Sequence, residues 1–190
     1  VSHTHWDREW YLTLWDHKLK LPYVLDKAID LLLKEPRFVC FMLDGQVAAL
    51  EDYLEVRPEK RDVVRRLVSE GRLLIGPFYT QPDEFLVSGE AIIRNLLLGI
   101  RTARIYGGCA MVGYLPDTFG HTAQLPQILR GFGIDNLFFM RGLGDEEDEL
   151  GTEFIWEAPD GSRILAIYFR EGFCNANMLG LPAPRAPVIW

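Results

Sequence analysis

The opening segment, VSHTHWDREWY, combines residue types that can hold a metal ion or a sugar. His5 and Asp7 are two positions apart, so in an extended segment their side chains project from the same side. An imidazole and a carboxylate together suit a divalent metal, and zinc accepts such nitrogen and oxygen ligands. The pair also fits a solvated start of the chain, although the aromatic residues beside it argue against an exposed tail. We therefore expect a strand end whose side chains project into a site.

A second segment, GYLPDTFGHT at residues 113–122, places an acid directly after an apolar run. Asp117 is suited to three roles in this position: metal ligand, nucleophile, or N-cap of a following helix. Gly120 permits a tight turn before that helix. The residues of this segment alone leave the three roles open.

Composition narrows the class of protein. The 190 residues are 48% hydrophobic and 25% charged, as expected for one domain with a core of its own. A net charge of −7 argues against a nucleic-acid partner. The three cysteines form no CxxC pair, which argues against a disulfide framework or a cysteine zinc site. No apolar run is long enough for a membrane span and no signal peptide is visible, so we expect a cytoplasmic protein without membrane contact.

Apolar periodicity predicts strands that alternate with helices. The expected strands are 37–43, 72–76, 109–115 and 136–140, with a hairpin of 153–158 and 163–169 around PDGS. The expected helices are 21–34, 46–54, 58–70, 88–106 and 121–131. This order is typical of a parallel α/β sheet or barrel, in which chemistry lies at the carboxyl ends of the strands.

Polar residues follow the expected strands at those ends. They are Asp44, Asp83, Glu84, Asp117 and Arg141. His5 and Asp7 would follow a first strand of which only Val1 and Ser2 remain, so the chain is expected to be truncated at its start, and its Pro-rich end suggests the same there. We therefore expect residues 1–190 to form the N-terminal part of one catalytic domain.

Together, the motifs resemble glycoside hydrolase family 38, the zinc-dependent α-mannosidases, in its bacterial branch. The resemblance is carried by SHTHWDREWY, LDGQ, GPFYTQPDEFLVSGEAIIRNLLLG, LPDTFGH and FFMRG, and it extends to about Asn177. It implies a parallel seven-stranded (β/α) barrel of the hydrolase and deacetylase type, of which this chain covers only part. It also implies one Zn²⁺ per site and an α-mannoside substrate, with a homo-oligomer as an option for the full-length enzyme.

The resemblance also assigns roles to residues. His5, Asp7 and Asp117 match zinc ligands, and Asp117 also matches the catalytic nucleophile of a retaining mechanism. Arg141 matches an arginine that contacts the nucleophile. The residues expected to contact substrate are Trp10, Phe119, Asp44, Asp83 and Glu84. The family's fourth zinc ligand and its acid/base carboxylate would lie beyond Trp190, so this chain alone is expected to be inactive.

Two other functions fit the residues. One is a metal-dependent carbohydrate deacetylase, which would release acetate rather than mannose and needs a metal-bound water with an acid/base pair. The other is a non-catalytic fragment that binds carbohydrate or metal. Zinc titration combined with an assay on an α-mannoside separates both from the α-mannosidase.

Overall fold

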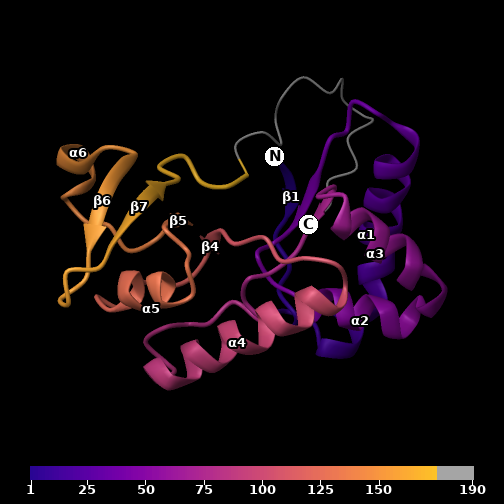
Figure 1. Cartoon of the computed structure of the whole chain (residues 1–190), viewed down its shortest axis with the longest axis horizontal. Helices are drawn as coiled ribbons and strands as arrows, with labels where there is room; N and C mark the ends of the chain where they lie inside the picture. Colours follow the sequence, from indigo (N-terminus) through magenta and orange to yellow (C-terminus); the bar gives the residue numbers. More distant parts are fainter. Residues whose placement is uncertain (175–190) are drawn as a thin grey trace.

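A computed structural model describes residues 1–174, which form seven short strands in two sheets (Figure 1). The first sheet is parallel, in the order β1 (Ser2–Thr4), β2 (Phe41–Leu43) and β3 (Leu73–Leu74). The second has the order β4 (Gly113–Leu115), β5 (Asn136–Phe139), β7 (Arg163–Tyr168) and β6 (Glu153–Glu157). Only β6 runs antiparallel, because the expected PDGS hairpin turns it back along β7.

The expected barrel is wrong for this chain. The described strands form a three-stranded and a four-stranded sheet, not a closed seven-stranded barrel. The ladder between β2 and β3 is interrupted after Leu74, because Gly76 takes a positive φ and Pro77 has no amide hydrogen to donate. It resumes only as a single parallel bridge between Gln46 and Phe78. Beyond that point Ala110 N–H donates to the Ile75 carbonyl at 2.9 Å, but β4 begins only at Gly113.

The helices follow the predicted order, but the first begins earlier and the one after β4 later than predicted, and the short helix after β5 was not predicted. They are α1 (Leu14–Lys34), α2 (Ala48–Val56), the 3₁₀ helix η1 (Pro58–Lys60), α3 (Arg61–Ser69), α4 (Gly89–Ile105), α5 (Leu125–Gly131) and α6 (Glu147–Leu150). Helix α1 begins well before the expected Leu21, because Thr13 and Asp16 form a capping box in which each side chain bonds to the other's backbone N–H. Pro22 is therefore buried inside the helix. No helix within residues 1–174 has the length and apolar character needed to cross a membrane.

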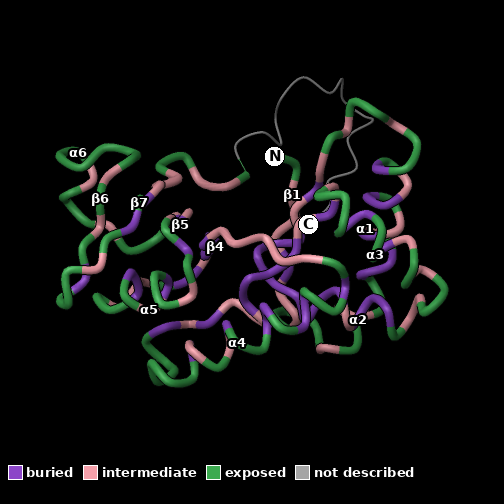
Figure 2. The backbone as a smooth tube through the Cα atoms, in the orientation of Figure 1, coloured by how far each residue is buried: buried purple, intermediate pink, exposed green. Residues whose placement is uncertain are grey.

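Helix α4 joins two hydrophobic cores. Its Ile92 and Leu96 pack in the core of the second sheet, whereas Ala103 packs in the core of the first. Figure 1 shows α4 running beneath both sheets, and Figure 2 shows buried segments on either side of it. The helix begins where the sequence predicts, because the Ser88 hydroxyl accepts the Ala91 N–H at 3.2 Å.

Gly99 allows α4 to lie directly against the backbone of Pro77 and Phe78. Gly99→Ala is therefore expected to destabilise the protein by about 3 kcal/mol. A Cβ atom at this position would lie 2.2 Å from the Pro77 carbonyl oxygen and 2.4 Å from the backbone of Phe78. These are backbone atoms, so the clash cannot be relieved by a rotamer change. The measurement is denaturant unfolding of the complete gene product.

Gly89→Ala is the matched control on the same helix. A Cβ atom there meets no heavy atom within 4 Å, and alanine is the better helix former. We expect it to leave stability unchanged or to raise it slightly. Equal unfolding midpoints for the two variants would contradict the close packing of α4.

Candidate active site

His5 lies just after β1, and a buried carboxylate fixes its ring. Asp44, which follows β2, is fully buried. One of its oxygens lies 3.2 Å from His5 Nδ1, and the other accepts the Trp6 N–H at 2.8 Å and the Gln46 side-chain amide at 2.9 Å. Since an ionised carboxylate only accepts hydrogen bonds, Nδ1 carries a hydrogen and Nε2 is the ring atom turned to the site. A carboxylate behind a histidine is the usual support of a metal-binding imidazole.

The outer nitrogen of His5 faces two further acids. Nε2 is buried and has no hydrogen-bond partner within residues 1–174. It lies 3.4 Å from Asp7 Oδ1 and 3.6 Å from Asp117 Oδ2. Two ligand atoms at a tetrahedral angle about 2 Å from one zinc ion are about 3.3 Å apart. The three side chains therefore fit a cation that all of them would share.

The three side chains in their present orientations do not form a complete set of metal ligands. Within residues 1–174, no set of three or more His, Cys, Asp or Glu side chains meets the geometry of a ready metal site. Both acids contact His5, and both are partly exposed, with side-chain exposures of 39% for Asp7 and 30% for Asp117. The orphaned Nε2 lies within 3.6 Å of both acids, so a rotation of their carboxylates would bring their oxygens onto an ion shared with His5.

The charges around His5 favour a positive group at its ring. Burial lowers the pKa of His5, but the hydrogen bond to Asp44, the close contact with Asp7 and the charges of both acids outweigh burial and raise it to about 10. The close contact with the His5 ring lowers the pKa of Asp7 in turn. Without a metal, the ring therefore carries a second proton, on Nε2, near neutral pH. A cation that binds Nε2 would replace that proton.

Asp117 also meets a permanent positive charge. It follows β4, and Arg141, which follows β5, places both Nε and Nη2 2.6 Å from its Oδ1. The guanidinium lies over the ring of Phe119 at 5.0 Å. Arginine stays charged at all relevant pH values, so this contact holds a positive charge against the Asp117 carboxylate.

The structure brings some of the predicted site residues together and separates others. His5, Asp7, Asp44, Asp117 and Arg141 form one cluster. Three further predicted residues are exposed or half-buried: Trp10 at 68% and Phe119 at 66% exposure, and Asp83 half-buried. Glu84 is buried, and both its oxygens bond to groups of the segment after β4.

A small cavity of about 270 Å³ opens beside the cluster. It is lined by His5, Trp6, Asp7, Arg8, Glu9, Gln46, Thr80 and Gln81. Sequence reasoning did not assign Arg8, Gln46, Thr80 or Gln81 to the site, although all of them lie inside the motifs that it singled out. The Gln81 amide donates to the Asp44 carbonyl at 2.6 Å, so this residue also supports the acid behind His5.

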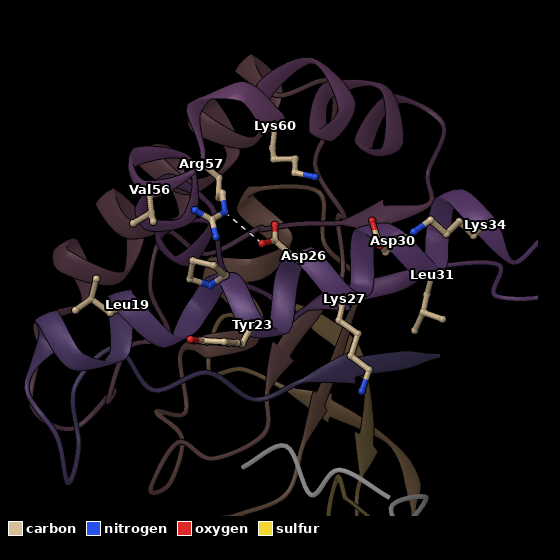
Figure 3. Close-up of a pocket in the computed structure, with 11 residues that line it drawn as sticks. Leu19, Tyr23, Asp26, Lys27, Asp30, Leu31, Lys34, Val56, Arg57 and Lys60 are labelled. Atoms are coloured by element: carbon tan, nitrogen blue, oxygen red, sulfur yellow. Dashed lines mark hydrogen bonds and ion pairs between the residues drawn. The ribbon is translucent and has the colours of Figure 1, made fainter. Parts of the chain in front are cut away.

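A larger cavity of about 840 Å³ lies elsewhere, along α1 where it faces the end of α2 and η1 (Figure 3). Asp26 occupies its middle, 3.2 Å from Arg57, and accepts the Tyr53 hydroxyl at 2.6 Å. None of the predicted site residues lines it. Both of its acids already pair with bases, Asp26 with Arg57 and Asp30 with Lys34, so we place the chemistry at the smaller cavity.

Comparison with known proteins adds an independent observation. Residues 1–180 match the model of the glycosyl hydrolases family 38 N-terminal domain. A protein of Halalkalibacterium halodurans, to which mannosylglycerate hydrolase activity has been attributed, is 40% identical over all of this chain and 22% of its own length. The chain thus spans about a fifth of that relative.

Two solved structures superpose on this chain. The structure of an alpha-mannosidase from Enterococcus faecalis superposes with a TM-score of 0.89 and 40% identity, over 95% of this chain and 21% of that one. A 4-alpha-glucanotransferase from Thermococcus litoralis superposes with a TM-score of 0.63 over 88% of this chain and 26% of that one. At 18% identity the second match concerns the fold alone.

Proposed function

The chain belongs to glycosyl hydrolase family 38, and from this membership we propose that the protein is a zinc-dependent α-mannosidase that retains the configuration of its substrate. The substrate class is a terminal α-mannoside of a glycan or of a mannosyl conjugate. Two relatives support this class, because their names refer to an alpha-mannosidase and a mannosylglycerate hydrolase.

The observation that carries the proposal is the environment of His5 Nε2. This buried nitrogen has no hydrogen-bond partner within residues 1–174 and faces carboxylate oxygens of Asp7 and Asp117. His5, Asp7 and Asp117 would hold the zinc ion. When bound, zinc supplies Lewis-acid chemistry and orients the sugar hydroxyls.

The residues of the chain perform the remaining work in this proposal. Asp117 attacks the anomeric carbon while the glycosidic bond breaks, and the leaving oxygen takes a proton from the acid/base carboxylate of the full-length enzyme. The glycosyl group is then held as an ester on Asp117 until water, which gives a proton back to that carboxylate, releases it. Arg141 orients the attacking carboxylate through its charged contact with Oδ1. Asp44 holds the ring of His5, and Trp10 offers an exposed apolar face to the C–H groups of the sugar.

The test is an assay of the complete gene product on a chromogenic α-mannoside, before and after removal of metal by a chelator. We expect activity to fall on chelation and to return with Zn²⁺, and the first sugar product to be the α-anomer by proton NMR. Release of acetate from an acetylated sugar without mannosidase activity would favour a deacetylase instead. Zinc-independent hydrolysis would remove the metal from the proposal.

Zinc binding is also expected to release about one proton near neutral pH. The pKa of His5 is raised to about 10, so the metal-free ring is protonated there and must lose its Nε2 proton to become a ligand. Affinity should therefore rise as the pH rises toward that value. Titration calorimetry in two buffers of different ionisation enthalpy measures the release, and a binding enthalpy that is the same in both buffers would exclude His5 as the ligand.

A further inference from the structure

A buried acid and a buried histidine join two of the loops that follow the strands. Glu84 lies in the loop after β3, and His121 in the segment after β4; their side chains are 0% and 4% exposed. His121 Nδ1 lies 2.8 Å from Glu84 Oε1, and the other carboxylate oxygen accepts the Thr122 N–H at 2.8 Å. Both oxygens are therefore satisfied by the neighbouring segment, and neither is turned to a sugar.

The loop after β5 packs on the same histidine. A Cβ atom at Gly142 would lie 3.2 Å from His121 Cδ2 and 3.3 Å from the Gly120 Cα. The ring of His121 also stands edge-on to Phe139 of β5 at 5.2 Å and to Trp156 of β6 at 6.0 Å. Three loops and the second sheet thus meet at one imidazole.

Further contacts fix the segment between Asp117 and His121. The Thr118 hydroxyl donates to the Pro82 carbonyl at 3.3 Å, again toward the loop that carries Glu84. Gly120 has φ +102°, and a Cβ atom there would lie 2.6 Å from the ring of Phe85. Little freedom is left for the backbone that carries Asp117 while the Glu84 bonds are intact.

We propose that the Glu84–His121 pair positions the two residues of the site that face each other, Asp117 and Arg141. Asp117 precedes the segment that Glu84 binds, and Arg141 precedes Gly142, which packs on His121. The pair would thereby set the 2.6 Å contact between Arg141 and Asp117 without touching substrate. This assigns Glu84 a positioning role in place of the expected substrate contact, and it rests on the proposed function for the role of Asp117.

The main variant is Glu84→Gln, which keeps the shape of the side chain but gives up one acceptor. We expect kcat on the α-mannoside to fall on the order of 100-fold with KM changed by less than about threefold, because a nucleophile displaced by about 1 Å loses reaction rate rather than substrate binding. The assay temperature lies below the unfolding range of every variant. The control is Glu147→Gln on α6, which should keep the parental kcat. It also removes a hydrogen-bonded carboxylate, because Glu147 accepts the Tyr168 hydroxyl at 2.8 Å.

A second pair of variants separates positioning from a general loss of fold. Asparagine places an amide donor close to the position of Nδ1. The kcat of His121→Asn should therefore be at least about tenfold higher than that of His121→Ala. A kcat of Glu84→Gln within about threefold of the parent, or equal losses in the two His121 variants, would overturn the proposal.

Amide hydrogen exchange tests the pair independently of the mannosidase assay. In Glu84→Gln the peptide that spans residues 117–122 should exchange faster than in the parent, while Glu147→Gln leaves its exchange unchanged. A parental protein without activity on α-mannosides would remove the proposed function. The pair is then judged by exchange: faster exchange in Glu84→Gln supports it, and unchanged exchange overturns it.

Discussion

Asp117→Asn is expected to lower kcat on α-mannosides by about 1,000-fold or more in the complete gene product. The amide that replaces the carboxylate is a poor nucleophile, so the glycosyl ester of the proposed retaining mechanism cannot form. Stability should change by less than about 1 kcal/mol, because Arg141 is 44% exposed and remains hydrated when its partner is lost. The measurement is steady-state kinetics together with thermal unfolding.

Asp30→Asn provides the comparison for this loss. Asp30 is a half-buried aspartate of α1 that pairs with Lys34 at 2.7 Å and lies outside the candidate site, so its replacement should leave kcat unchanged. If Asp117→Asn kept more than about a tenth of the parental rate, Asp117 would not be the nucleophile.

Asp44→Ala is expected to weaken both the fold and the metal site. The side chain is fully buried and accepts hydrogen bonds from Trp6 and Gln46 as well as from His5. Removing it leaves the Trp6 N–H and the charged His5 ring without their acceptor, and takes one of two acceptors from the Gln46 amide, at a cost of roughly 3–5 kcal/mol. The ring of His5 also loses its support, which should lower zinc affinity by about 10–100-fold.

Denaturant unfolding and zinc titration measure the two effects separately. Asp26→Ala is the control. Asp26 also accepts hydrogen bonds from two side chains, Tyr53 and Arg57, but it lies at the larger cavity shown in Figure 3. It should cost some stability and leave zinc affinity unchanged. Parental zinc affinity in Asp44→Ala would show that Asp44 does not support a metal ligand.

The elements that depend on near neighbours were predictable from the sequence. Ser88 begins α4 by accepting an N–H three residues later, and PDGS turns β6 back onto β7. Thr13 and Asp16 carry an equally local signal that was overlooked, so the start of α1 was misplaced. Each of these features is decided within one turn of chain, where residue types and spacing define the hydrogen bonds.

The position of the polar residues at strand ends was also predictable. Parallel strands place their carboxyl ends on one side, so residues that follow different strands come close to one another. This applies to His5 after β1, Asp44 after β2, Asp117 after β4 and Arg141 after β5. The motifs therefore indicated which residues would meet, before any distance was known.

What each carboxylate does was decided by the tertiary structure. Asp44 meets His5 across 39 residues of chain, and Glu84 meets His121 across 37. Sequence reasoning expected both acids to contact substrate, whereas the fold buries them against donors that come from distant segments. Residue types and spacing determined the chemistry that was available here, and burial and long-range pairing determined which atoms face the site, since those contacts form only when remote parts of the chain pack together.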